Sequence, residues 1–216
     1  MAPKVTEIKK IITRNYNPKY GPAELYTGEH DGEMWATNRY WLTRAERIAP
    51  LLEQYNLSAA EPGTFDVNGT VRQAGRQVPN FSAFVLSQKD HAPAIPVRIA
   101  GNQVYTRIDR GVLYAAFLLA DGTHAGLDAG TLEWLSDTDT APLPEQEDGT
   151  RLRYGDIRVS FDKNSHGIPS AVITAEVFHV IERSRWDDEA RDYIPAVEEP
   201  AEPRVLGMMM GLSYGA

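Results

Sequence analysis

The chain contains no cysteine. This absence excludes disulfide bonds, thiol nucleophiles and cysteine-ligated zinc, and it suits a protein of a reducing compartment. Long apolar runs are also missing, and none approaches the roughly 20 residues that a membrane-spanning helix needs. Residues 1–10, MAPKVTEIKK, lack the apolar segment of a signal peptide. Together these absences predict a cytoplasmic protein that makes no membrane contact.

Motifs of the common enzyme classes are absent as well. The sequence has no GxxxxGK[ST] phosphate loop, no GxGxxG fingerprint and no GxSxG nucleophile motif. Its five histidines are scattered, and none forms an HExxH or HxH pair that could begin a metal site. We therefore predict no catalytic residue, no cofactor and no metal. An enzyme whose active residues converge only in the folded chain is the third of three alternatives.

Basic residues are fewer than acidic ones, with 22 Lys and Arg against 30 Asp and Glu. The formal net charge is −8 over 216 residues. Compact sequence-specific DNA-binding proteins are usually basic, so the balance argues against a simple repressor. A single positive face on an acidic protein would still be compatible with DNA binding. The length is enough for one or two domains with a proper core.

Two segments of the chain resemble each other. Residues 31–57 and 101–137 each begin at a Gly-containing turn and continue as a strand rich in aromatic and aliphatic residues. Each strand passes a threonine that precedes polar residues (Thr37 and Thr106), and each segment later reaches a short amphipathic helix. Internal duplication of this kind is typical of stacked or ring-forming modules.

Hydrophobic periodicity predicts the elements of the first half. A helix over 4–15 would place an apolar stripe opposite a mildly basic side. Strands are expected over 23–30 and 33–45, with a hairpin turn at His30-Asp31-Gly32. A second helix should begin near Pro50, because proline suits the first helical position.

The second half repeats the same order of elements. Strand patterns return from Ile95, and Asp128 is a good N-cap for a helix that follows it. Further strands are expected over 157–161, 170–181 and 204–214, and residues 186–203 read as an acidic, mobile loop. The prediction is an α+β fold of two modules, residues 1–80 and 81–216, each an antiparallel sheet with two short helices.

Five phrases, in this order, resemble those of a DNA sliding clamp, the processivity factor of replicative polymerases, of phage type or like the bacterial β-clamp. They are spread over most of the chain, from residue 31 to residue 212. They are Asp31-Gly32 with 34–42 (MWATNRYWL), Ile48-Ala49-Pro50 with Leu51-Leu52, Val78-Pro79-Asn80-Phe81, 126–135 (GLDAGTLEWL), and 204–212 (RVLGMMMGL).

The resemblance implies a ring, with a homotrimer favoured, that encircles double-stranded DNA. Sheets would form the outer shell and helices would line the pore, where basic side chains meet phosphates. The candidates for these contacts are Lys10 and Arg14, followed by Lys4, Lys9, Arg44 and Arg47.

The resemblance also implies a hydrophobic pocket that captures short peptide motifs of DNA polymerase and the clamp loader. Its candidate residues lie near the end of the chain: Val205, Leu206, Met208, Met209 and Met210. The main alternative is a non-enzymatic structural or interaction protein, a phage virion or regulatory component, that does not bind DNA.

Overall fold

A computed structural model gives the fold of most of the chain. It describes residues 9–10, 13, 24–30, 32–54, 56–66, 92–93, 95–96, 105–107, 112–141, 143, 146, 150–163, 169–182, 184–187 and 190–214. Two of the predicted DNA-facing residues, Lys4 and Arg14, lie outside this set.

Antiparallel sheet dominates the described residues. The largest sheet has eight strands. In spatial order these are β4 (Gly63–Asp66), β1 (Glu24–His30), β2 (Glu33–Thr37), β3 (Trp41–Arg44), β14 (Val197–Met210), β11 (Pro169–Glu182), β10 (Arg151–Lys163) and β5 (Ala92–Pro93). Two short α-helices, α2 (Ala49–Glu53) and α3 (Ala129–Ser136), accompany it. The predicted α+β class is confirmed.

Smaller sheets complete the architecture. One contains β15 (Leu212–Tyr214), β9 (His124–Asp128), β8 (Val112–Leu118) and β6 (Ile95–Pro96), with β7 (Tyr105–Arg107) also paired to β8. Another is a hairpin of β12 (Arg185–Asp187) and β13 (Asp192–Ile194). Two 3-10 turns, η2 (Ala45–Ile48) and η5 (Thr138–Thr140), directly precede α2 and follow α3.

Strand β14 joins the first and last parts of the chain. It pairs with β3 on one side, at Gly207 with Thr43, and with β11 on the other. The eight-stranded sheet therefore runs across the expected boundary between residues 80 and 81. The division into two modules stays a prediction.

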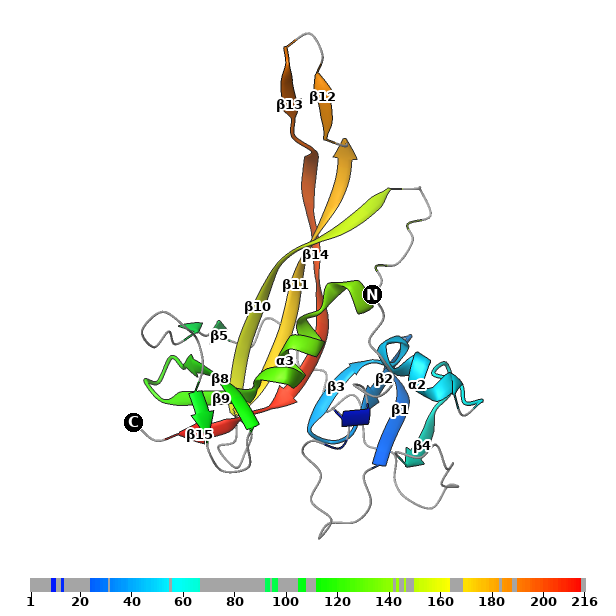
Figure 1. Ribbon diagram of the computed structural model, residues 1–216, viewed down its shortest axis with the longest axis vertical. Coiled ribbons are helices and arrows are strands. Elements are labelled where there is room, and N and C mark those ends of the chain that lie inside the picture. The colour runs from blue at the N-terminus through cyan, green and yellow to red at the C-terminus, as the bar shows by residue number, and fades with distance from the viewer. Residues whose placement is uncertain are drawn as a thin grey trace.

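A long ribbon of β10, β11 and β14 extends away from the rest of the protein, with the β12/β13 hairpin at its far end (Figure 1). The prediction of an acidic loop over 186–203 is wrong. Its residues pair instead, with Pro200 opposite Phe178 and Trp186 opposite Tyr193. Pairing with a partner strand decides strand formation more than acidic composition does.

Residues 33–45 form two strands and a 3-10 turn, so the prediction of one long strand is also wrong. The Asn38 side-chain oxygen accepts from the backbone N–H groups of Tyr40 and Trp41, at 3.0 and 3.1 Å. Arg39 takes a left-handed conformation, with φ 78°. This local side-chain bonding makes a turn that reverses the chain between β2 and β3.

Both predicted helix starts are confirmed. Asp128 Oδ1 accepts a 2.7 Å hydrogen bond from the Thr131 N–H, which satisfies one of the free donors at the start of α3. Pro50 occupies the first turn of α2. Leu51 and Leu52, which follow it, are buried.

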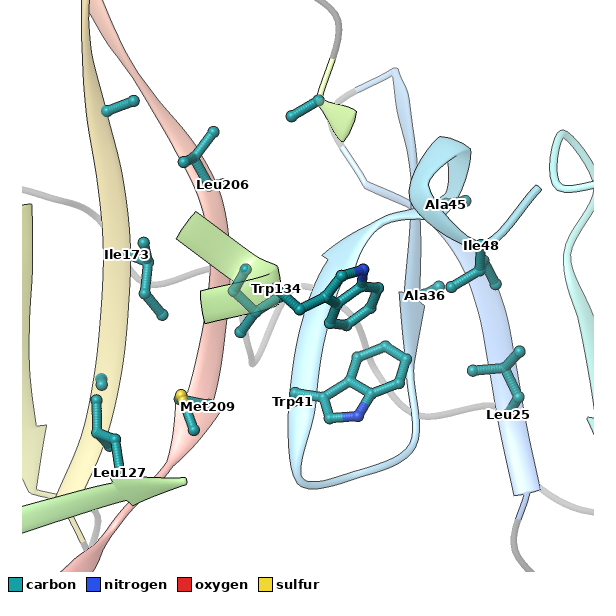
Figure 2. Close-up of a cluster of buried hydrophobic side chains, with 14 of the residues drawn as sticks. Leu25, Ala36, Trp41, Ala45, Ile48, Leu127, Trp134, Ile173, Leu206 and Met209 are labelled. Carbon is teal, nitrogen blue, oxygen red and sulfur yellow. The ribbon is translucent and has the colours of Figure 1, made fainter. Parts of the chain in front are cut away.

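The core draws on both expected modules (Figure 2). Trp41 from β3 meets Trp134 from α3 edge to face, with ring centroids 5.1 Å apart. Strand β14 contains a bulge beside this core. Gly207 pairs with Ile173 and Val205 pairs with Thr174, so Leu206 is the extra residue.

The bulge changes which side chains of β14 share a face. Leu206 and Met209, three residues apart, both enter the large core. Val205 and Met208 pack instead in a second cluster with Tyr26 and Trp35.

Candidate functional site

A cavity of about 640 Å³ lies between the β1/β2 hairpin and the base of the long ribbon. Its size is within the range of sites that hold small molecules or peptide side chains. Apolar and charged side chains line it together. The apolar ones are Trp35, Leu143, Leu152, Val177 and Val205, and the charged ones are Glu33, Arg44, Glu202 and Arg204.

Arg44 is the most deeply placed cation of this cavity. The residue is only 8% exposed, and its guanidinium carbon lies 4.3 Å from the centre of the Trp35 ring. Nη1 forms an ion pair with Glu33, while the buried Nε has no hydrogen-bond partner. Burial, with a further contribution from Arg204, lowers the pKa of Arg44 to about 10.

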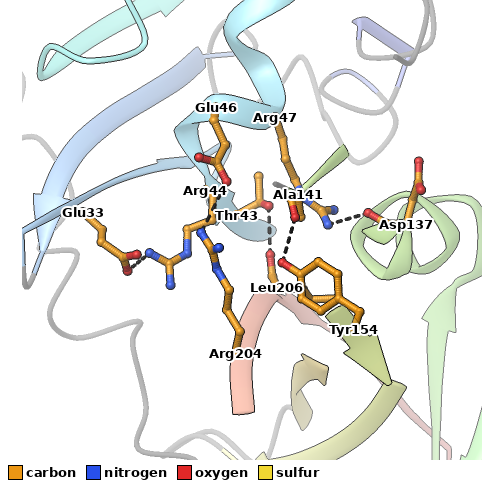
Figure 3. A network of polar contacts seen from close by, with 10 residues as sticks. All are labelled: Glu33, Thr43, Arg44, Glu46, Arg47, Asp137, Ala141, Tyr154, Arg204 and Leu206. Carbon is orange, nitrogen blue, oxygen red and sulfur yellow. Dashed lines mark hydrogen bonds and ion pairs between the residues drawn. The ribbon is translucent and has the colours of Figure 1, made fainter. Parts of the chain in front are cut away.

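Arg204 approaches the same cavity from β14. Its Nη2 lies 3.5 Å from Glu46 Oε1, and its side chain is 14% exposed. Figure 3 shows the guanidinium groups of Arg44 and Arg204 close to each other, with Glu33 beside the first and Glu46 near the second. The cavity thus has two neighbouring cations on an apolar floor.

Arg47 lies on the other side of this network and is 1% exposed. Nη1 donates to the Trp134 and Leu135 carbonyls at 2.7 and 3.0 Å, and Nη2 donates to the Asp137 carbonyl at 2.7 Å. Burial is the main reason that its pKa falls to about 10. Arg47 therefore satisfies the carbonyls that a helix leaves free at its C-terminal end.

Two of the residues expected to contact phosphate, Arg44 and Arg47, lie in this network. Both are buried; the Arg44 guanidinium lies toward Glu33 at the cavity, and the Arg47 guanidinium lies against the end of α3. An arginine that contacts duplex phosphate needs an accessible guanidinium.

Of the predicted DNA-facing residues, Lys9 and Lys10 lie in a described helical segment. Lys9 is half-buried and Lys10 is exposed. The Thr13 hydroxyl donates back to the carbonyls of Lys9 and Lys10, at 2.9 and 3.2 Å, as expected one turn along a helix. Lys10 is the best-exposed cation among the four candidates that the structure describes.

The predicted peptide-binding residues are not brought together. Val205 lines the cavity. Leu206, Met208 and Met209 are buried in the two hydrophobic clusters, and Met210 is 40% exposed at the end of β14. Three of the five therefore serve packing in this chain.

The pairing that builds the cavity wall was not predicted from the sequence. Trp35 and Arg44 are direct cross-strand partners in the β2/β3 hairpin. The sequence does contain a signal for this pairing, namely Asn38. Asparagine favours tight turns, so a turn at this position could have been predicted. Recognising that turn would have placed the arginine over the indole ring.

Other kinds of site find no support in the described part of the chain. No group of three His, Asp or Glu side chains there could hold a metal ion. None of the helices described there combines the length and the apolar character needed to cross a membrane. No protein-family model, curated protein or solved structure matches the chain.

Proposed function

We propose that this protein is a DNA sliding clamp, a polymerase processivity factor that encircles duplex DNA. One observation carries the proposal beyond the sequence phrases. The order of hairpin followed by helix occurs twice, since β2/β3 leads into α2 and β8/β9 leads into α3. Both helices contribute to one core, through Leu51 and Trp134 among others. Duplicated units of this kind suit a closed ring.

Contact with DNA in this proposal falls to the N-terminal helical segment. The exposed acidic side chains Glu53 and Glu133 lie on α2 and α3, and neither helix contains Lys or Arg. Lys10 offers an exposed cation. Because the chain is acidic and offers few basic contacts to phosphate, its electrostatic attraction to DNA would be weak. Encirclement would then be what keeps the ring on DNA.

Capture of partner peptides falls to the cavity beside β14. Its mixture of apolar wall and few charged groups is typical of a peptide or small-molecule site. Val205 supports this placement, because the resemblance puts the pocket beside the last strands of the chain. DNA polymerase and a clamp loader are the proposed partners, and a homotrimer is the proposed assembly.

Two measurements test the clamp. Light scattering after gel filtration should give the mass of a trimer, and the protein should stay on closed circular DNA but leave it after linearisation. Lys10→Glu should weaken retention and make it more sensitive to salt. Arg185→Glu, which changes an exposed arginine of the far hairpin, is the matched control and should behave as wild type. Equal retention on circular and linear DNA would rule out encirclement.

One feature favours the second candidate, a structural or interaction protein that does not bind DNA. Four large apolar side chains are about half exposed on the far part of the ribbon: Ile181, Trp186, Tyr193 and Val197. Clusters of exposed apolar side chains commonly mark contacts with other proteins. An oligomer that shows no retention on either form of DNA would favour this candidate over the clamp.

A further inference from the structure

The far end of the long ribbon concentrates exposed apolar side chains. In the described part of the chain, seven large apolar residues are exposed, and four of them lie within residues 181–197: Ile181, Trp186, Tyr193 and Val197. Each of the four is between 48% and 58% exposed. Single exposed apolar residues are normal on a protein surface, but a concentration in so short a segment commonly marks a contact with another molecule.

Trp186 and Tyr193 form the outermost part of this surface, in the β12/β13 hairpin (Figure 1). The two residues are direct cross-strand partners, so their side chains emerge on the same face of the hairpin. The Tyr193 hydroxyl donates to Ser184 Oγ at 2.6 Å, which restrains the phenol ring. A two-stranded hairpin is only marginally stable by itself in water, so a partner that covers these rings would stabilise it.

The charge of this part of the ribbon limits the kind of partner. Residues 182–202 contain eight Asp and Glu against three Arg, so their formal net charge is −5. Among these acidic residues, Glu182, Asp192 and Glu199 are exposed. The negative charge repels a nucleic-acid backbone and an anionic membrane, and it attracts a cationic partner.

The two aromatic rings suit the same cationic chemistry. A guanidinium or ammonium group is attracted to the face of a tryptophan or tyrosine ring. The cation–π contacts within the described part of the chain use the rings of Tyr26, Trp35 and Phe178. Neither Trp186 nor Tyr193 takes part in one of them, so both rings are open to a cation from a partner.

We propose that the surface formed by Ile181, Trp186, Tyr193 and Val197, the ribbon-end surface, docks a basic segment of a partner protein. Arg or Lys side chains of that segment lie over the two aromatic rings, and its aliphatic side chains contact Ile181 and Val197. None of these four residues lines the cavity beside β14. The inference goes beyond the proposed clamp and does not depend on encirclement of DNA.

The test compares three peptides that differ at three positions. Rhodamine-labelled Gly-Arg-Leu-Arg-Leu-Arg-Gly, and the same sequence with Gln or with Glu in place of Arg, are capped at both termini. Each is titrated with the full chain and followed by fluorescence anisotropy. The Arg peptide should bind at least about tenfold more tightly than the Gln peptide, and the Glu peptide should bind weakest. Equal binding of the Arg and Gln peptides, or no binding of the Arg peptide, would overturn the proposal.

Tryptophan fluorescence locates the bound peptide on the molecule. The chain has four tryptophans, of which Trp35, Trp41 and Trp134 are buried and Trp186 is exposed. Acrylamide should therefore quench mainly Trp186, and the bound Arg peptide should protect that ring from quenching. Quenching that stays the same when the Arg peptide is bound would contradict the assignment to this surface.

Two double variants test the role of the aromatic rings at constant net charge. Trp186→Ala with Tyr193→Ala should abolish the preference for the Arg peptide over the Gln peptide. The matched control is Leu113→Ala with Leu118→Ala, which removes two exposed apolar side chains of β8 and should keep the preference. A preference that survives loss of both aromatic rings would overturn the proposal.

Two further double variants separate the ribbon-end surface from the general attraction of an acidic protein. Glu182→Gln with Glu199→Gln should weaken binding of the Arg peptide. Glu53→Gln with Glu133→Gln removes the same charge from exposed positions of α2 and α3 and should leave the binding nearly unchanged. Equal losses in the two variants would show attraction to the whole chain and contradict the assignment.

Other classes of partner would give different results. Tighter binding of a labelled thymidine hexanucleotide than of the Arg peptide would indicate a nucleic-acid surface and overturn the proposal. Sedimentation with phosphatidylcholine vesicles that Trp186→Ala abolishes would indicate a membrane surface and overturn it as well. Failure of the clamp is measured separately, because loss of retention on circular DNA leaves the preference for the Arg peptide intact, and loss of that preference leaves retention intact.

Discussion

Arg47 Nη1 lies 2.7 Å from the carbonyl oxygen of Trp134, which is 87 residues further along the chain. The contact ties the 3-10 turn after β3 to the end of α3. It therefore links the two segments whose sequences resemble each other.

Loss of Arg47 should destabilise the fold. Arg47→Ala leaves three carbonyls at the end of α3 without their charged donor, and we expect unfolding to become easier by about 2–4 kcal/mol. Urea denaturation followed by circular dichroism measures the change. Arg151→Ala, at an exposed position of β10, should shift stability by less than about 0.5 kcal/mol. Similar values for the two variants would show that Arg47 does not hold the helix.

Trp41 and Trp186 lie in different environments, so replacing each with alanine should change stability by different amounts. Trp41 is 2% exposed and packs on Trp134, so Trp41→Ala should cost about 3–5 kcal/mol of unfolding free energy. Trp186 is 58% exposed on the far hairpin, and Trp186→Ala should change stability by less than about 1 kcal/mol. Thermal or urea unfolding of the two variants distinguishes them. A large loss in Trp186→Ala would mean that the hairpin packs on the protein body.

Gly207 allows α3 and β3 to approach β14 closely. A Cβ at this position would lie 2.6 Å from the Leu42 carbonyl oxygen and 2.9 Å from Leu135 Cδ2. Gly207→Ala should therefore lower stability by about 1–3 kcal/mol through overpacking. Gly122→Asn is a suitable comparison, since Gly122 has φ 80° with nothing near its Cβ and asparagine tolerates that conformation. Comparable losses in both variants would contradict the packing explanation.

Tyr154 should make stability depend on alkaline pH. Burial raises the pKa of its phenol above the usual 10.0, with Arg204 and Arg47 acting in the opposite direction, and its hydroxyl donates to the Ala141 carbonyl at 2.7 Å. The folded state thus favours the protonated phenol, and the unfolded chain loses the proton first. The stabilisation is fully present below pH 10 and declines as pH rises through the folded pKa.

To test this prediction, the free energy of unfolding is measured for the wild type and for Tyr154→Phe from pH 8 to 11, and the two values are subtracted at each pH. That difference should be constant up to about pH 9 and then shrink, because only the wild type has this phenol to ionise. Arg44 and Arg47 are present in both proteins, so their contributions to the pH dependence of the unfolding free energy cancel in this difference. A difference that grows with pH would have the wrong sign for a buried neutral phenol.

Local signals in the sequence were enough for part of this fold. The N-cap at Asp128, the helix start at Pro50 and the turn at Gly32 are each set by a few neighbouring residues, so they could be predicted from the sequence. The antiparallel α+β class followed from the same signals. The pairing of β3 with β14 joins residues more than 150 positions apart, and no local pattern reports it.

The candidate site could be predicted only in part, for the same reason. Val205, predicted to bind peptide from its place near the end of the chain, lines the cavity. Arg44 and Arg47 were chosen as cations, yet distant elements bury them: Arg47 is held by carbonyls of α3, and Arg44 stacks on Trp35. Whether an arginine faces solvent or interior depends on partners that arrive from elsewhere in the chain.

The central place of β14 also governs how the protein can be made. The ribosome produces β3 long before residues 197–210 exist, so the nascent chain carries an open strand edge throughout most of its synthesis. Closing that edge requires a contact between distant residues, which folds slowly compared with local structure. Expression should therefore respond to chaperone supply and to growth temperature, because an unpaired edge on a nascent chain invites aggregation.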